Sequence, residues 1–208
     1  MYNISYHRNI YVYLYNMRIV QPIREPTKIA NIKQNLKKLE NPRDYLLFVF
    51  GINTALRISD ILKLNVGDVL DKNGKIKKIL HVQEQKTKRQ ARISLNEAIT
   101  DALERFFDKN PPTDYDKPLF ISKRSTKRLD RTQSWRLINK WCREVGLTSE
   151  RYGNHSLRKS FGYMARKYNG YSIELIQKKL GHRSPDVTRA YIGITQDEVE
   201  DMEMKMNL

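Results

Sequence analysis

The sequence has little cysteine and no long apolar segment. Cys142 is the single cysteine among 208 residues, which excludes an internal disulfide framework and favours a reducing compartment. No apolar run approaches the length of a membrane span, and no secretory signal pattern opens the chain. We therefore expect a cytoplasmic protein without a membrane partner.

Acidic residues are also scarce relative to basic ones. The chain has 23 Asp and Glu against 39 Lys and Arg, which gives a formal net charge of +16. An excess of this size on a folded domain indicates a polyanionic partner, because Lys and Arg neutralise phosphates. An anionic membrane surface would be favoured by a basic amphipathic helix, which the sequence does not show as a separate element. With 39% hydrophobic residues, the chain can bury a core and is not expected to be disordered.

The chain divides into a leader, a main domain and a tail. Residues 1–26 combine a tyrosine-rich start, which could be a pairing strand, a docking arm or a poorly ordered leader, with the proline-containing linker "QPIREP". Residues 27–194 form one domain. Residues 195–208 are an acidic, helix-prone tail whose Val199, Met202 and Met206 recur at helical spacing and could contact another protomer.

Within the main domain, helical periodicity dominates. Asn41 with Pro42 predicts the start of a buried helix, and Ser59 is the expected N-cap of a short second one. Trp135 and Trp141 are expected in the core of a later helix that ends at Gly146. Further helices are expected from Thr27, over 96–110, and in the segments "NHSLRKSFGYMARKY", "SIELIQKKLG" and "SPDVTRAYIG".

Two regions read as strands. "KIKKILHV" and "RQARISL" show partial alternation around "QEQKTK", which predicts a hairpin or strand pair, and "PLFIS" predicts a short strand. The expected fold is therefore α+β and mainly helical, with a small antiparallel sheet.

Several residues indicate a function only when they are considered together. Alone, Arg57 is a plausible capping residue, His155 and Arg158 merely share a helix face, and His182 and Tyr191 fit a helix cap and a core aromatic. Together with Lys86 they form a cationic pocket that one tyrosine can reach, and such a pocket suits a phosphodiester.

The chemistry of such a set follows from its side chains. Arginines can bind the non-bridging oxygens and stabilise a pentacoordinate transition state. A phenol with an ordinary pKa near 10 needs a positive environment or a base in order to attack at neutral pH. A lysine in a mobile hairpin can protonate the leaving 5′-oxygen. Because no Asp/Glu/His metal-ligand cluster stands out, we expect side chains to supply the positive charge, without a metal or another cofactor.

The chain resembles the catalytic domain of the tyrosine recombinases, the integrase family of phages and mobile elements. The stretches that carry the resemblance are "TALRISDILKL", "EQKTKRQARISL", "HSLRKSFG" and "LGHRSPDVTRAYIG". The resemblance implies that Arg57 and Arg158 are the catalytic arginines, supported by Asp60, and that Tyr191 is the nucleophile. It implies that Lys86 is the general acid, that His155 assists proton transfer from the nucleophile, and that His182 donates a hydrogen bond to the scissile phosphate. Lys88 is the alternative to Lys86, which is favoured by its "KT" context.

The resemblance also bears on DNA binding and assembly. Family members usually carry a helical core-binding domain before the catalytic one, whereas only residues 1–26 precede the first expected helix here. We therefore expect a minimal recombinase, a catalytic fragment or a partner-dependent enzyme. The family also implies two protomers per DNA site and four in a synapse. Residues expected to contact duplex DNA lie in the hairpin and in the basic loop "KRSTKRLDR", which could equally be a solvated loop; they are Lys88, Arg89, Lys123, Arg124, Lys127, Arg128 and Arg131.

The sequence thus predicts a site-specific DNA recombinase or integrase that acts through a 3′-phosphotyrosyl intermediate, without metal or ATP, in integration or excision of a mobile element or phage. Two alternatives remain open. One is a nicking-closing enzyme of the topoisomerase IB kind, which shares the chemistry but rejoins the same strand. The other is a DNA-binding protein on the same fold that forms no covalent bond.

Overall fold

The computed structural model describes residues 20–123, 125–194 and 196–206, without the side chains of 196–199 and 201. The tyrosine-rich leader before residue 20 lies outside the described residues. The elements follow in the order α2 Pro26–Lys38, α3 Pro42–Thr54, α4 Ile58–Ile61, α5 Val66–Val69, β1 Ile79–Gln83, β2 Gln90–Ser94, α6 Glu97–Lys109, α7 Arg131–Glu144, α8 Asn154–Lys167, α9 Ile173–Leu180, α10 Pro185–Ile192 and α11 Gln196–Lys205. In the described part of the chain, no helix is long and apolar enough to span a membrane.

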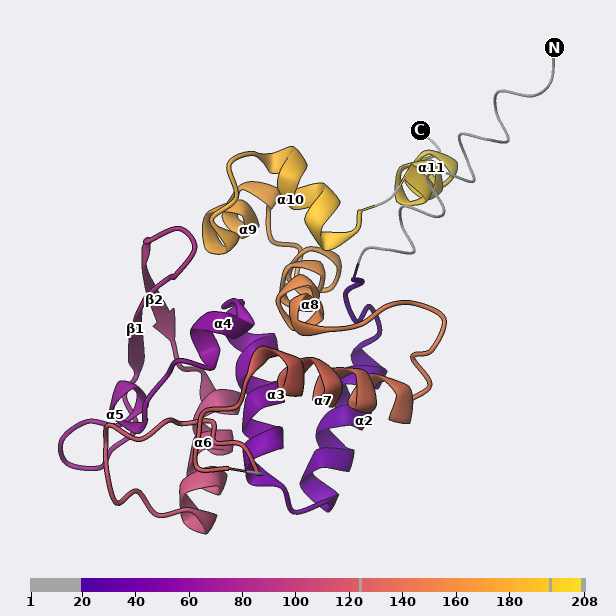
Figure 1. The fold of residues 1–208 in the computed structure, drawn as a ribbon. Coiled ribbons are helices and arrows are strands. Elements are labelled where there is room, and N and C mark those ends of the chain that lie inside the picture. The colour runs from indigo at the N-terminus through magenta and orange to yellow at the C-terminus, as the bar shows by residue number, and fades with distance from the viewer. Residues whose placement is uncertain (1–19, 124, 195, 207–208) are drawn as a thin grey trace.

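Helix α3 forms the centre of the larger hydrophobic core. Its N-cap Asn41 accepts a hydrogen bond from the Asp44 backbone, and Pro42 occupies the first turn, as the sequence predicts. Helices α2, α6 and α8 pack against it (Figure 1). Phe48 and Phe50 are fully buried and make edge-on contacts with Trp141 and Phe120. This core is the rigid base on which the candidate site is built.

Helices α8, α9 and α10 enclose a second, smaller core, formed by Ala55, Tyr163, Ala165, Ile173, Ile176, Leu180 and Ile192. Helix α8 lies between the two cores, because it contacts α3 on one side and α9 and α10 on the other (Figure 1). Gly162 in α8 permits close packing, since a Cβ there would lie 2.6 Å from Ile192 Cγ2. The side chain of Ile192, next to Tyr191 in α10, is fully buried, so the second core fixes the helix that carries the tyrosine.

Strands β1 and β2 form an antiparallel hairpin in which Leu80 faces Ile93 and Val82 faces Ala91. These four side chains are buried, and the residues between them are exposed, which is the alternation expected of a half-buried hairpin. The connecting turn projects from the helical body toward α9 (Figure 1). The mainly helical α+β fold with a small antiparallel sheet is therefore confirmed.

Three local predictions are wrong. Helix α4 begins at Ile58 with Arg57 as its N-cap, because the backbone N–H groups of Asp60 and Ile61 both donate to the Arg57 carbonyl, so Ser59 lies inside the helix. Residues 118–122 form no strand; they make only isolated bridges, through Pro118 and Ile121. Trp135 is 48% exposed and lies against Gly153 instead of entering the core, whereas Trp141 is buried as predicted.

The ends of α9 and α10 agree with the sequence signals. Ser172 and Ser184 cap α9 and α10, and Gly181 and Gly193 end them in the left-handed conformation. The tail is helical in α11, and Met202 within it and Met206 directly after it are exposed. The side chain of Val199 lies outside the described residues.

Candidate active site

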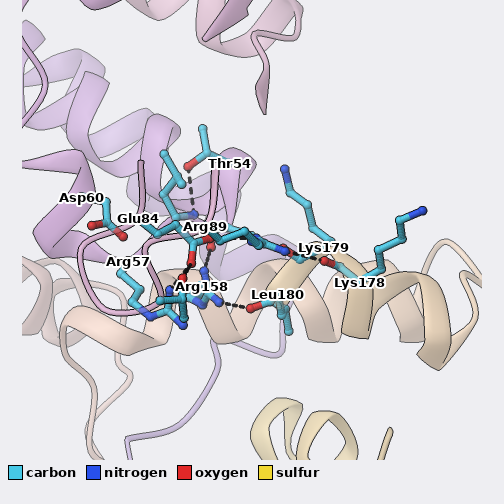
Figure 2. Close-up of polar contacts among 12 residues, drawn as sticks. Thr54, Arg57, Asp60, Glu84, Arg89, Arg158, Lys178, Lys179 and Leu180 are labelled. Atoms are coloured by element: carbon cyan, nitrogen blue, oxygen red, sulfur yellow. Dashed lines mark hydrogen bonds and ion pairs between the residues drawn. The ribbon is translucent and has the colours of Figure 1, made fainter. Parts of the chain in front are cut away.

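Arg158 is the most deeply buried cation of the site. It lies on α8, its side chain points toward the ends of α3 and α9, and the residue is only 3% exposed. Its guanidinium donates to the backbone carbonyls of Ala55 and Leu180 (Figure 2). Both carbonyls lie at helix C-termini, where the helix dipole favours a cation. These contacts compensate for the burial of the charge and hold Arg158 in one orientation.

Arg57 lies beside Arg158 and is held by a carboxylate from the hairpin. Residue 55 has a left-handed backbone conformation, and this turn between α3 and α4 places Arg57 at the N-cap of α4. One guanidinium nitrogen, Nη1, donates to Glu84 Oε2 at 2.5 Å. The Arg57 side chain keeps 16% of its surface exposed, so it can still meet a ligand from solvent.

Glu84 is a site residue that was not singled out from the sequence. Its side chain is 1% exposed, and its oxygens accept hydrogen bonds from Arg57 and from Arg89 Nη2 at 2.7 Å (Figure 2). They also accept one from the Thr87 hydroxyl at 2.7 Å. Burial alone would raise its pKa, but the hydrogen bonds from Thr87, Arg89 and Arg57 lower the pKa of Glu84 to about 2. A signal was present: Glu84 continues the inward alternation of Leu80 and Val82, and an acid at an inward position requires a partner.

Asp60 supports the same region from α4. The residue is 2% exposed, and its Oδ1 accepts a hydrogen bond from the Gln85 backbone N–H at 3.0 Å. The carboxylate therefore ties the short helix that follows Arg57 to the turn that follows β1. Lys86 and Lys88 are exposed in this turn, and Lys88 has a left-handed backbone conformation with a φ of 56°.

Tyr191 lies on α10 between two histidines and a lysine. Its hydroxyl is 3.4 Å from His155 Nδ1, its ring meets that of His182 edge-on at 4.7 Å between centroids, and Lys159 Nζ lies 5.1 Å from its ring centre. Burial raises the pKa of the phenol, while the charges of Arg158 and Arg57 and a hydrogen bond from Arg158 lower it. The resting tyrosine is therefore protonated and lies in a positive field.

Both histidines are held in the neutral form. Partial desolvation, together with the charges of Arg158, Arg131, Lys159 and Arg57, lowers the pKa of His155 below its ordinary 6.5. Desolvation and the charges of Arg158 and Arg57 lower the pKa of His182 to about 4. A neutral His155 can accept a proton from Tyr191. His182 Nδ1 is 3.1 Å from the Thr188 hydroxyl, which fixes the plane of the ring.

Lys159 is a second residue that the sequence argument missed. It follows Arg158 directly, is 6% exposed, and has its pKa lowered to about 8 by burial and by the charge of Arg24. The "HSLRK" stretch contains it, but nothing in the spacing indicates that its ammonium lies over the tyrosine ring.

The structure therefore brings together Arg57, His155, Arg158, His182 and Tyr191, with Asp60 and Glu84 connecting the cluster to the hairpin. Lys86 lies in the exposed turn that follows Glu84. Among the described residues, no group of His, Cys, Asp and Glu has the arrangement of a metal site.

The residues proposed for DNA contact divide into two kinds. Lys88, Lys123, Lys127 and Arg131 are exposed. Arg128 instead donates to the carbonyls of Leu62, Lys63 and Leu64, and Arg89 donates to those of Lys178 and Lys179 besides Glu84, so both already hold parts of the fold together. Arg124 lies outside the described residues.

The fold is that of the catalytic domains of tyrosine recombinases. The phage integrase family model matches residues 25–198, and the chain belongs to that family.

Among curated relatives, the probable integrase/recombinase YoeC of Bacillus subtilis is 41% identical over 181 residues, which cover 87% of this chain and 93% of that protein. Tyrosine recombinase XerC of Caldanaerobacter subterraneus is 28% identical over 174 residues, which cover 81% of this chain but only 47% of that protein. The chain therefore matches the former along nearly its full length and spans about half of the latter.

Solved structures show the same fold. A crystal structure of XerA recombinase superposes with a TM-score of 0.69 at 22% identity, covering 91% of this chain and 67% of that one. A lambda integrase dimer bound to a COC′ core site superposes with a TM-score of 0.62 at 18% identity, covering 84% of this chain and 49% of that one.

Proposed function

We propose that this site-specific recombinase acts on duplex DNA by transesterification at Tyr191. The Tyr191 oxygen attacks the scissile phosphorus, a 3′-phosphotyrosyl bond forms, and the bond from phosphorus to the 5′-oxygen breaks. The observation that carries the proposal is the position of the Tyr191 hydroxyl, 3.4 Å from a neutral His155 and in the field of Arg158 and Arg57. A 5′-hydroxyl from a partner strand then reverses the step, so the bond energy is conserved.

Each proton in this step has a donor and an acceptor. The phenol proton passes to His155 Nδ1, and the leaving 5′-oxygen takes a proton from Lys86. Arg57 and Arg158 bind the non-bridging oxygens and stabilise the charge that develops on them. For His182 to donate to the phosphate, its ring proton must be on Nε2, and the Thr188 hydroxyl must then donate to Nδ1, 3.1 Å away, instead of to the Ser184 carbonyl, 3.3 Å away.

The positive charge at the site supports a reaction that needs neither metal nor ATP. Three fixed side chains, Arg57, Arg158 and Lys159, supply cations around the tyrosine. Cleavage should therefore proceed in excess EDTA without nucleotide, and a strict requirement for Mg²⁺ would contradict this part of the proposal.

We also propose the biological setting by analogy with relatives. One neighbouring structure is a Tn1549 transposon integrase with a circular intermediate DNA, and another is a XerH recombinase bound to its difH substrate. Integration or excision of a mobile element, with protomers paired on DNA, fits these neighbours. Residues 27–194 would then be the catalytic domain, and the tail helix would contact another protomer.

Covalent trapping tests the proposal. The protein is incubated with nicked duplexes drawn from the DNA that flanks its gene, and denaturing electrophoresis detects a protein–DNA band. The band should appear with the wild type and disappear with Tyr191→Phe. Salt-sensitive binding with no band would favour the non-catalytic DNA-binding protein. Relaxation of supercoiled DNA at unrelated sequences would favour the topoisomerase-like enzyme.

A further inference from the structure

Glu84 occupies a position that the proposed chemistry does not explain. A carboxylate buried beside the phosphate-binding arginines repels the substrate unless its charge is fully compensated. Here the compensation is complete, since Arg57 and Arg89 donate to it (Figure 2), as does the Thr87 hydroxyl. The pair of Arg57 with Glu84 joins residues 27 positions apart, one on the helical body and one at the base of the turn.

The turn is connected to its surroundings at both ends. At the start, Gln85 N–H donates to Asp60, which lies three residues after Arg57. At the end, Arg89 donates to Glu84 Oε1 at 2.7 Å and to the carbonyls of Lys178 and Lys179 in the last turn of α9. The Glu84 carbonyl accepts from Lys88 N–H at 2.8 Å, which closes the loop around Lys86 and Thr87. Glu84 is thus the point at which the turn, Arg57 and, through Arg89, α9 are joined.

This arrangement fixes the Arg57 guanidinium and the backbone at Lys86 relative to each other. With Nη1 occupied by Glu84, the remaining donors of the Arg57 guanidinium, which is planar and rigid, face a defined direction. Lys86 is two residues from Glu84, and its long side chain leaves the turn from a backbone held by the same carboxylate. A neutral or shorter residue at position 84 would release both constraints while leaving the phosphate-binding groups present.

We propose that Glu84 is a positioning residue for DNA cleavage: through its bond to Arg57 it holds the turn of residues 85–88, and with it Lys86, over the phosphate that Arg57 binds. The inference rests on the proposed function, because it assigns to Lys86 the protonation of the leaving 5′-oxygen.

A sulfur substitution in the DNA separates this role from a merely structural one. The test uses the duplex on which the wild type forms its adduct, in two versions, with oxygen or sulfur as the 5′-bridging atom of the scissile phosphate. A thiol has an ordinary pKa of about 8.5, so a thiolate leaves without a proton donor. Loss of the general acid should therefore slow cleavage of the oxygen version strongly and cleavage of the sulfur version much less.

We expect Lys86→Ala and Glu84→Gln each to slow cleavage of the oxygen version by at least about tenfold, since general acid catalysis contributes about 10²–10⁴-fold. On the sulfur version both should approach the wild-type rate, and Glu84→Asp should recover part of the activity on the oxygen version. Arg57→Lys should be slow on both versions. Gln90→Ala, an exposed position on the same hairpin, should match the wild type on both.

Thermal denaturation is measured for each variant. If Glu84→Gln fails to fold, Thr87→Val is used instead, because it removes one hydrogen bond to Glu84 while keeping every charge. Thr87→Val should also cleave the oxygen version more slowly than wild type and the sulfur version at nearly the wild-type rate, with a smaller loss than that expected for Glu84→Gln. An equal loss on both versions for these variants, or no loss, overturns the role of Glu84. No adduct with wild-type protein on either version would instead overturn the proposed function itself.

Discussion

The Tyr191 hydroxyl and His155 Nδ1 lie 3.4 Å apart, on helices α10 and α8 that pack together through the smaller core. The lowered pKa of His155 keeps the imidazole neutral at pH 7, and the raised pKa of Tyr191 keeps the phenol protonated. The pair is therefore a proton donor and a proton acceptor in their resting states.

Replacing His155 should slow cleavage without preventing DNA binding. We expect His155→Gln to reduce the single-turnover rate by about 100-fold, because the variant can hydrogen-bond the phenol but cannot take its proton. In the wild type, the second-order rate constant for cleavage should fall with decreasing pH only below 6.5, where His155 becomes protonated. This role would be contradicted if the wild-type rate constant already fell to half above pH 6.5. It would also be contradicted if His155→Gln kept both the wild-type rate and its decrease at low pH.

The ammonium of Lys159 should assist the formation of the phenolate. Lys159→Met keeps most of the side-chain volume and removes the charge that lies over the ring, so cleavage at pH 7 should fall by about 2–30-fold. The difference from wild type should shrink as the pH rises past about 8, where Lys159 itself loses its proton. Lys179→Met, which removes an ammonium over Phe161, is the matched control and should show no such pH dependence. A constant ratio for Lys159→Met across pH would show that its charge does not act on Tyr191.

His182 should make the DNA-free protein sensitive to acid. The pKa of its ring is about 4 in the fold and 6.5 in the ordinary state, so the unfolded chain binds the proton first as the pH falls. The free energy of unfolding therefore decreases between pH 6.5 and about 4. Denaturant titrations should show that the free energy of unfolding decreases less over this range for His182→Gln than for wild type. His81→Gln, a substitution at an exposed position, should show the same decrease as wild type. An unchanged slope in His182→Gln would rule out this contribution. Glu84 adds a further loss at lower pH, from 4.5 toward about 2.

The basic loop offers two neighbouring residues with different expected effects. Lys127 is exposed, whereas Arg128 donates to three backbone carbonyls and to Asn65 Oδ1. Lys127→Ala should weaken DNA binding and reduce the slope of log K against log salt by about 0.9 if it contacts one phosphate, with the melting temperature unchanged. Arg128→Ala should lower the melting temperature, because it removes the hydrogen bonds that tie the loop to residues 62–65. The opposite pattern for the two variants would show that the loop binds DNA through Arg128.

Side-chain periodicity and capping signals were sufficient to predict most of the fold. The apolar stripes gave the main helices, and alternation gave the hairpin. The N-cap at Asn41 was predicted because it depends on neighbouring residues only. Ser59 failed because the burial of Ile58 and the preceding left-handed turn, which are tertiary features, set the start of α4.

The residues of the site also divide into those that the sequence indicates and those that depend on tertiary contacts. The candidates Arg57, His155, Arg158, His182 and Tyr191 came from spacing and resemblance, and the structure places them together. Arg89 and Arg128 read as surface cations because a sequence does not show which backbone carbonyls lie within reach. Lys159 escaped notice for the same reason, since Tyr191 is distant from it in the chain, and so did the contact of Glu84 with Arg57, 27 residues away.

The central claim is that Tyr191 forms the covalent bond to DNA through a 3′-phosphate. The most direct measurement is tandem mass spectrometry of the trapped adduct after digestion with protease and nuclease, combined with a test of whether the released DNA end accepts a 5′-phosphate from a kinase. The account predicts a nucleotide attached to the peptide that contains Tyr191, and a free 5′-hydroxyl on the released strand. Attachment at another residue, or a released strand that already carries a 5′-phosphate, would contradict it.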